Sequence, residues 1–231
     1  MANILLIASA TKVCSVAIAV DGVVACIKES VREEYSHAEL LTVYMEELLS
    51  GPWKGKKLDA VAVMDGPGSY TGLRIGTSAA KGFCFANDIP LIAVGSLYAW
   101  AAGLDEKFAN DIAADDLIIP MMDARRMEVY YAKYNAQLKE LEAPAALVVD
   151  EESAKEVFRD DKVHLVGDGV EKCAAVFNAI EGTVLHDLQL STAFMATEAE
   201  RRFNAAEFED LAYFEPFYLK DFIPGKPKKL L

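Results

Sequence analysis

The residues best suited to binding a ligand form a glycine-rich run, Gly66-Pro67-Gly68-Ser69-Tyr70-Thr71-Gly72, between a predicted strand and a predicted helix. Phosphate loops and serine nucleophile elbows occupy that place in α/β folds. The run lacks the Gly-Lys-Ser/Thr ending of a Walker A loop, and Pro67 and Thr71 stand where an elbow around Ser69 requires glycine. The pattern favours a sharp turn with Ser69 as the N-cap of the next helix. A phosphate bound at Gly68 and Ser69 is the alternative.

A second candidate phosphate contact is Gly167-Asp168-Gly169, which also follows a predicted strand. The chain offers little for metal chemistry. Its only histidines are His37, His164 and His186, and no two of them have a His-x-x-x-His or His-x-His spacing. We expect each histidine to be a surface or hydrogen-bonded core residue, so the sequence predicts no metal ligand and no catalytic residue.

The elements that hold these residues follow one another in two similar series. The first series comprises strands at 3–9, 13–20, 23–29, 58–64 and 91–94, with helices at 36–49, 70–86 and 96–103. The second comprises strands at 117–122, 127–134, 147–149, 163–166 and 183–185, with helices at 151–158, 170–180 and from 192. Each series has the order βββαβαβα, which predicts two α/β lobes, 1–104 and 105–231, with a cleft between them.

Turn and capping signals fix the ends of several elements. A Ser36-x-x-Glu39 capping box opens the helix at 36–49. Asp21-Gly22 is a type I′ hairpin signal whose register sets Ala17 opposite Cys26. That register keeps Cys14 away from Cys26, and we expect the four cysteines to be reduced thiols because none has a Cys-x-x-Cys spacing.

Small residues recur on one side of the helix at 70–86, where Gly72, Gly76 and Ala80 are spaced four residues apart. An interior glycine costs a helix about 1 kcal/mol relative to alanine, so such a row indicates close backbone contact. The contact is either with the chain's own sheet or with a partner. Since the helix at 36–49 is also apolar around much of its circumference, the second possibility is a partner-binding surface made by both helices.

The charge of the chain argues against direct binding of nucleic acid. The 231 residues include 23 Lys and Arg against 36 Asp and Glu, for a formal net charge of −13, whereas neutralising phosphates requires a basic surface. Residues 1–110 hold 9 basic and 12 acidic residues (net −3), and residues 111–231 hold 14 and 24 (net −10). The short basic segment Lys226–Lys229 is expected to be a solvated end of the chain.

Hydropathy predicts a folded protein without a membrane segment. The hydrophobic fraction is 53%, but the longest apolar stretches are strand-sized and fall short of the roughly 18 residues of a membrane span. The N-terminus has neither the basic region nor the cleavage site of a secretory signal. We therefore expect a cytoplasmic protein.

Five ordered motifs resemble those of one family. They are Ile7-Ala-Ser-Ala-Thr-Lys-Val-Cys-Ser-Val-Ala-Ile18, Gly66 to Gly76, Met122-Asp-Ala-Arg125 with Glu128-Val-Tyr130, Gly167-Asp-Gly169, and Pro216-Phe-Tyr-Leu-Lys220. Over nearly the whole chain they are similar to the TsaB (YeaZ) family. The resemblance implies an actin-like fold of the ASKHA, ribonuclease H-like class. It also implies a role in making threonylcarbamoyladenosine next to the anticodon of tRNAs that read codons beginning with A.

The resemblance further implies a non-catalytic scaffold that binds and activates its paralogue TsaD, which transfers the threonylcarbamoyl group. A small TsaE-like ATPase is the other implied partner, and the partners would bind the ATP and the metal, with no cofactor on this chain. Alone, the chain is expected to form a homodimer through the same surface. It is expected to meet tRNA only indirectly, with Lys226–Lys229 as the only segment near the RNA. The interface residues predicted on this basis are Leu41, Tyr44, Met45, Leu48, Leu73, Thr77 and Lys81.

At two places this sequence lacks residues that the related proteins use in catalysis or nucleotide binding. The resemblance places the metal-binding histidines of TsaD at Ser96 and Trp100, and neither residue can replace imidazole. Ala8 stands where the family has an acidic residue, which in actin-like kinases helps to hold the metal-nucleotide. The alternative function is a small actin-like kinase or ATPase that binds phosphate through Gly68, Ser69 and 167–169. A glycoprotease-type peptidase is a weaker alternative.

Overall fold

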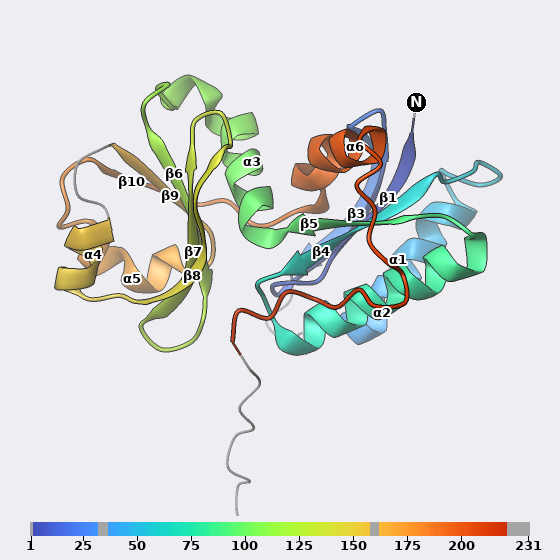
Figure 1. The fold of residues 1–231 in the computed structure, drawn as a ribbon, viewed down its shortest axis with the longest axis horizontal. Coiled ribbons are helices and arrows are strands. Elements are labelled where there is room, and N and C mark those ends of the chain that lie inside the picture. Colours follow the sequence, from blue (N-terminus) through green and yellow to red (C-terminus); the bar gives the residue numbers. More distant parts are fainter. Residues whose placement is uncertain (1, 32–36, 158–161, 221–231) are drawn as a thin grey trace, which may run out of the picture.

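The computed structural model describes residues 2–31, 37–157 and 162–220, and every structural statement below concerns those residues. Figure 1 shows two β-sheets side by side, each covered by helices. The first sheet has the order β3-β2-β1-β4-β5, and the second has the order β10-β9-β6-β7-β8. The strands are β1 (Asn3–Ala8), β2 (Val13–Val20), β3 (Val23–Val31), β4 (Ala60–Gly66), β5 (Leu91–Gly95), β6 (Leu117–Asp123), β7 (Glu128–Asn135), β8 (Glu140–Val148), β9 (Val163–Val166) and β10 (Thr183–His186).

The two sheets share one topology. In the first sheet β1, β4 and β5 run parallel, and β2 and β3 run antiparallel at one edge. In the second sheet β6, β9 and β10 run parallel, and β7 and β8 run antiparallel. The predicted duplication of a βββαβαβα unit is confirmed. The third strand of the second unit begins earlier than predicted, because the edge strand β8 has no continuously buried side that an apolar pattern would reveal.

Helices cover both faces of the first sheet. The pair α1 and α2 packs on one face, and α3, α6 and the short 3₁₀ turn η2 pack on the other. The core on this second face also takes in Ile118 and Ala132 from the second sheet, so α3 lies between the two sheets (Figure 1). The remaining helices, α4 and α5, cover the outer face of the second sheet. The bounds are α1 (His37–Ser50), α2 (Tyr70–Asn87), α3 (Ser96–Phe108), η1 (Ala109–Asp111), α4 (Glu151–Val157), α5 (Val170–Phe177), η2 (Thr192–Met195) and α6 (Ala196–Asn204).

The central helix α3 runs past the predicted end at Gly103 and continues to Phe108. Gly103 does not end the helix. It packs closely against η2, because a Cβ there would lie 2.5 Å from ring atoms of Phe194. The glycine lets η2 approach the helix closely. Sequence pattern could not distinguish this role from a C-terminal cap, since both favour glycine.

The C-terminal part of the chain returns to the first sheet. Glu209 N donates to Leu91 O at 2.9 Å, and Phe217 N donates to Asp65 O at 2.8 Å. Helix α6 packs against β5, β1 and β3. Residues 105–231, predicted as one lobe, are therefore divided: the strands of the second sheet form that lobe, while α6 and the segment after it join the first.

A hydroxyl cluster holds this return in place. Ser15 and Ser191 both donate through Oγ to Glu29 Oε2, at 3.0 and 2.8 Å, and Ser15 Oγ lies 2.8 Å from Thr192 Oγ1. Small side chains on one face of β2 accommodate this approach, because Ala17 and Ala19 lie in the same core as residues of η2 and α6.

The hairpin register differs from the prediction by one residue. A β-bulge beside Ile18 and Ala19 leaves Ala25 unpaired, so Ile18 faces Cys26 and Ala17 faces Ile27. The prediction of Ala17 opposite Cys26 is wrong because a turn signal sets only the first pairs, and a bulge shifts all later ones. Cys14 is still well separated from Cys26. The capping box at Ser36 lies outside the described residues.

Helix α2 begins as predicted, with Ser69 Oγ accepting a hydrogen bond from Gly72 N at 3.3 Å. The row of small residues packs on the chain's own sheet. A Cβ at Gly72 would lie 2.1 Å from Ser9 O, and a Cβ at Gly76 would lie 2.2 Å from Ser9 Oγ. Of the two readings left open by the sequence, the structure selects close approach of α2 to the end of β1. Among the helices of the described residues, none combines the length and hydropathy required of a bilayer-spanning segment.

Candidate functional site

Most of the predicted interface residues belong to the protein's own core. Leu41, Leu48 and Leu73 are fully buried, and Met45 and Thr77 are only 7% and 5% exposed. They are therefore wrong as partner contacts, except that Met45 reaches the floor of a groove described below. The spacing of Leu41, Met45 and Leu48 is that of one helical face, and tertiary packing turns that face toward the sheet.

The other two predicted residues lie at the edges of the helix pair. Tyr44 donates through its hydroxyl to Ser30 Oγ at 3.0 Å. Lys81 Nζ donates to Ala212 O at 3.2 Å and Phe214 O at 2.9 Å. Lys81 thus binds the C-terminal segment to α2, which is a structural role within the chain.

A different part of the same helices is open to solvent. A groove of about 480 Å³ runs between α1 and α2. We call it the helix groove, and its lining residues are Thr42, Met45, Glu46, Leu49, Ser50 and Phe83. On the same helix pair Phe85, in α2, is 82% exposed, and Val43, in α1, is 41% exposed. An apolar groove and a protruding aromatic side chain on one helix pair are typical of a protein-binding surface.

A second cavity, the interlobe cleft, has a volume of about 570 Å³ and lies between the β1–β2 turn and the loops that follow β9 and β10. It brings Thr11 and Lys12 together with Gly167 and Asp168. Sequence reasoning found the last two residues and missed the first two. The available signal was a lysine in the short turn between two buried strands, which is a weak indication by itself.

The predicted phosphate contacts do not meet in this cleft. Gly68 and Ser69 pack against the β1–β2 turn, where Ser69 N donates to Ala10 O at 2.7 Å, and neither residue lines the cavity. In the other loop Gly169 N donates to Met121 O at 3.0 Å. The backbone N–H groups of Ser69 and Gly169 are thus already used within the chain, which argues against a nucleotide phosphate at these two residues.

Asp168 adds an unfavourable charge for a phosphate. Its Oδ1 accepts from Asp123 N at 2.8 Å. Desolvation in the cleft raises the pKa of Asp168 to about 6, although part of the residue is open to solvent, and the backbone hydrogen bond from Asp123 acts in the opposite direction. Above that pH a carboxylate faces the cavity, and Lys172 and Lys12 are cations that act on it.

Two of the three histidines form a buried chain with an aspartate. His164 Nε2 lies 2.8 Å from Asp116 Oδ2, and His164 Nδ1 lies 2.8 Å from His186 Nε2. His37 Nε2 lies 3.0 Å from Val13 O. The prediction of hydrogen-bonded core histidines is confirmed for His164, and desolvation lowers the pKa of His186.

The positions that the resemblance assigns to metal-binding histidines are occupied by packed side chains. Ser96 and Trp100 are 0% and 1% exposed, and Trp100 Nε1 donates to Leu188 O at 2.9 Å. Within residues 2–31, 37–157 and 162–220, no group of three or more His, Cys, Asp or Glu side chains has the arrangement of a metal site. The residues present at Ser96 and Trp100 therefore do not fit a metal.

Sequence comparison supplies the family. A sequence model described as "TsaD: tRNA N6-adenosine threonylcarbamoyltransferase" matches residues 32–221, which is most of the chain. The chain belongs to this family. Within it, the predicted resemblance to TsaB (YeaZ) proteins is confirmed.

Two relatives of the TsaD-family chain are named tRNA threonylcarbamoyladenosine biosynthesis protein TsaB. The protein from Haemophilus influenzae is 32% identical over 136 residues, which are 58% of this chain and 55% of the relative. The protein from Escherichia coli is 34% identical over 132 residues, which are 57% of this chain and 54% of the relative. The matched segment thus spans about half the length of these curated relatives. The solved YeaZ structure from Pseudomonas aeruginosa has a TM-score of 0.76 at 24% identity and covers 95% of this chain and 100% of its own. That likeness confirms the actin-like, two-lobed fold.

Proposed function

We propose that this chain is a non-catalytic subunit for threonylcarbamoyladenosine synthesis on tRNA, which binds and activates a TsaD-type threonylcarbamoyltransferase. Family membership supports the pathway. The observation that carries the non-catalytic role is the burial of Ser96 and Trp100 within the core, where a metal-dependent transferase would need imidazoles. The modified adenosine lies 3′ of the anticodon in tRNAs that read A-starting codons.

The helix groove and Phe85 form the proposed contact with the TsaD-type partner. A paralogue of related fold offers matching helices, so the two proteins pair pseudo-symmetrically across their first lobes. Phe85 supplies a large apolar side chain that loses its solvent on binding, and the groove receives a side chain from the partner's helix. The same surface makes a homodimer when the partner is absent, and a small TsaE-like ATPase completes the assembly.

Two surface substitutions test this interface. Phe85→Asp places a charge at an exposed apolar position, and Thr42→Arg fills the helix groove, so each leaves the core intact. We expect each variant to lose at least 100-fold in affinity for the purified TsaD-type paralogue, measured by calorimetry. The mass of the isolated chain in light scattering should fall toward the 25.2 kDa of a monomer.

The matched control is Leu141→Asp on β8, which charges a similarly exposed apolar side chain of the second sheet. It should bind the paralogue as the unmodified chain does. Unchanged affinity of both Phe85→Asp and Thr42→Arg, with normal circular dichroism, would place the interface elsewhere.

Depletion of the chain in its own cells tests the pathway. Nucleoside analysis of bulk tRNA should show loss of threonylcarbamoyladenosine, and a plasmid copy should restore it. A normal content of the nucleoside after complete depletion contradicts the proposed function, whatever the interface variants do.

The alternative of a small kinase or ATPase depends on the interlobe cleft. Lys12 favours an anion there, but the used N–H groups of Ser69 and Gly169 and the apolar Ala8 oppose a nucleotide phosphate. We therefore expect no heat of binding when ATP and Mg²⁺ are added to the isolated chain. Micromolar binding accompanied by phosphate release would replace the scaffold proposal with this one.

A further inference from the structure

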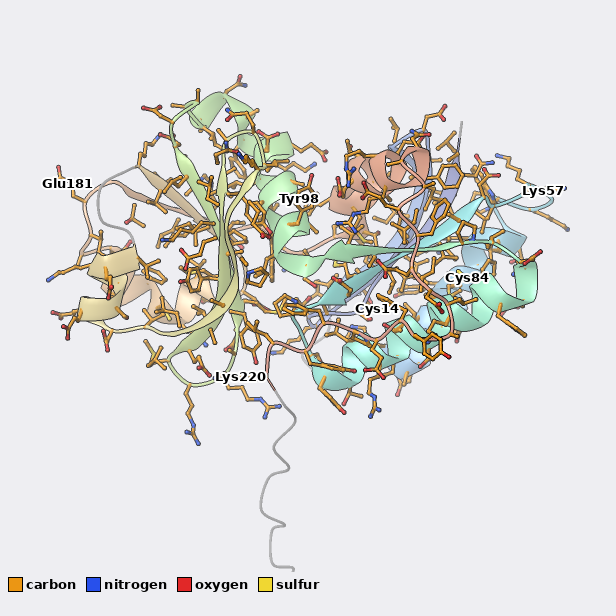
Figure 2. The ribbon with its side chains drawn as sticks, in the orientation of Figure 1. Cys14, Lys57, Cys84, Tyr98, Glu181 and Lys220 are labelled. Atoms are coloured by element: carbon orange, nitrogen blue, oxygen red, sulfur yellow. The ribbon has the colours of Figure 1, made fainter. Side chains whose placement is uncertain are left out.

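A third cavity, which we call the Asp65 pocket, shares no lining residue with the interlobe cleft. Its volume is about 500 Å³, within the range of small-molecule sites. Both lobes build it: Asp65 comes from the end of β4, Tyr98 from α3, Tyr134 from β7, and Glu198 and Arg202 from α6. Figure 2 shows Tyr98 in the middle of the molecule, between the two sheets.

The carboxyl group of Asp65 is an anomaly in this pocket. Its Oδ1 is buried and has no hydrogen-bond partner among the described residues. Buried carboxylate oxygens are nearly always paired, because losing water without a new partner costs free energy. Burial raises the pKa of Asp65 to about 6, and Arg202 and the backbone N–H of Asp65 itself only partly oppose this rise. At neutral pH the pocket thus holds a charge that the fold compensates only in part.

The nearest cation is already committed elsewhere. Arg202 Nε donates to Glu198 Oε1 at 2.8 Å, and Glu198 also accepts a hydrogen bond from Arg201 Nε. Within the described chain Asp65 forms no ion pair. With Glu140 on the rim, the lining side chains comprise three carboxylates and one guanidinium, so the pocket has an excess of negative charge.

Two aromatic side chains also line the Asp65 pocket. Tyr98 and Tyr134 pack edge to face, with ring centroids 5.9 Å apart and an interplanar angle of 78°. Aromatic faces beside a carboxylate attract organic cations, because the ring quadrupole and the carboxylate act in the same direction. Leu97 and Phe217 supply an apolar wall for the body of a ligand.

We propose that the Asp65 pocket binds a small organic cation, an ammonium or guanidinium group on an apolar body, whose charged nitrogen pairs with the carboxylate of Asp65 where it lines the pocket. The site is independent of the proposed TsaD-type interface, since neither the helix groove nor Phe85 lines it. It is also separate from the cleft that contains Lys12 and Asp168.

The test uses three probe cations with the full-length chain: phenethylammonium, butylammonium and phenylguanidinium, each compared with a neutral alcohol of the same shape. Binding is followed by NMR of labelled tyrosines at pH 7.5, with thermal unfolding as a second readout. At least one cation should shift the resonances of Tyr98 and Tyr134 saturably and raise the melting temperature. Its neutral counterpart should bind at least tenfold more weakly.

Two isosteric variants decide which carboxylate is responsible. Asp65→Asn should weaken cation binding at least tenfold and abolish the gain in melting temperature. Asp168→Asn removes a cleft carboxylate of the other cavity and should leave binding within twofold. No saturable binding of any probe up to about 10 mM overturns the proposal. Equal affinity for cation and alcohol, or unchanged binding to Asp65→Asn, overturns it as well.

Discussion

At the scale of single residues, the buried carboxyl group of Asp65 lowers the stability of the fold when it is ionised. Its Oδ1 is buried without a partner, and desolvation raises its pKa to about 6. A carboxyl that binds its proton more tightly in the folded state than in the unfolded state is costly to ionise on folding. Groups that cost stability are often kept for binding, which agrees with the cation site proposed here.

The raised pKa of Asp65 determines how its effect on stability depends on pH. The contribution of Asp65 is fully present below about pH 4 and is lost as the pH rises through about 6. Asp65→Asn removes the charge, so at pH 7.5 it should raise the free energy of unfolding by about 1–3 kcal/mol. The gain should shrink toward zero at pH 4. Urea titrations at both pH values measure it, and destabilisation at pH 7.5 would mean that Asp65 is paired in solution.

At the scale of elements, α1 and α2 are apolar on more than one side, and packing decides which side is core. The face of α1 with Leu41 and Leu48 meets β2, whereas Phe85 of α2 projects into solvent. Leu41→Asp therefore cannot separate partner binding from folding. A buried charge at that position, without a partner, prevents folding.

Stability measurements can separate the two faces. Leu41→Ala should cost about 2–5 kcal/mol, because it leaves a cavity in a packed core. Phe85→Ala should change stability by less than about 0.5 kcal/mol. Urea unfolding of both variants checks the assignment. A large loss for Phe85→Ala would show that this ring is packed in solution.

The start of α2 allows a sharper test of local structure. Ser69→Ala removes the acceptor for Gly72 N and should cost about 1 kcal/mol in chemical denaturation. Ser69→Asp keeps an acceptor at the cap and is the matched control, with stability close to that of the unmodified chain. Equal losses in the two variants would show that the cap is not the source of the effect.

At the scale of the whole molecule, charge is distributed unevenly, with −3 over residues 1–110 and −10 over residues 111–231. The acidic residues of the second stretch lie in the second lobe and also in α6 and the segment after it, which join the first lobe. We propose that these acidic surfaces face away from RNA. If the TsaD-type partner supplies the phosphate contacts, this chain, with its net charge of −13, must bind on the side of the partner that is away from the tRNA phosphates. The basic segment Lys226–Lys229 lies outside the described residues, and its proximity to RNA stays a prediction.

Isolated chain should therefore not retain tRNA at physiological salt in a filter-binding assay, whereas a mixture with the TsaD-type partner should. The reason is the net charge of −13, since releasing counterions from phosphates requires a basic surface. Submicromolar binding of tRNA by the isolated chain, weakened by added salt, would contradict indirect contact.

Much of the fold was predictable because its signals are local. Hydrophobic periodicity and turn chemistry involve neighbouring residues, so the order of elements, the Asp21-Gly22 turn and the Ser69 cap could all be read without tertiary information. The bulge at Ala25 and the extension of α3 past Gly103 could not, because each depends on a contact with another element.

The sequence by itself determined the duplicated α/β units, the family resemblance and the poverty of metal ligands, all of which depend on residue types and their order. Tertiary structure decided which face of α1 and α2 is exposed, returned α6 to the first sheet, and gathered Asp65, Tyr134 and Arg202 around one pocket. The physical reason is that burial and unsatisfied charge belong to surfaces that meet in space. Residues far apart in the chain create those surfaces only when the two sheets close on α3.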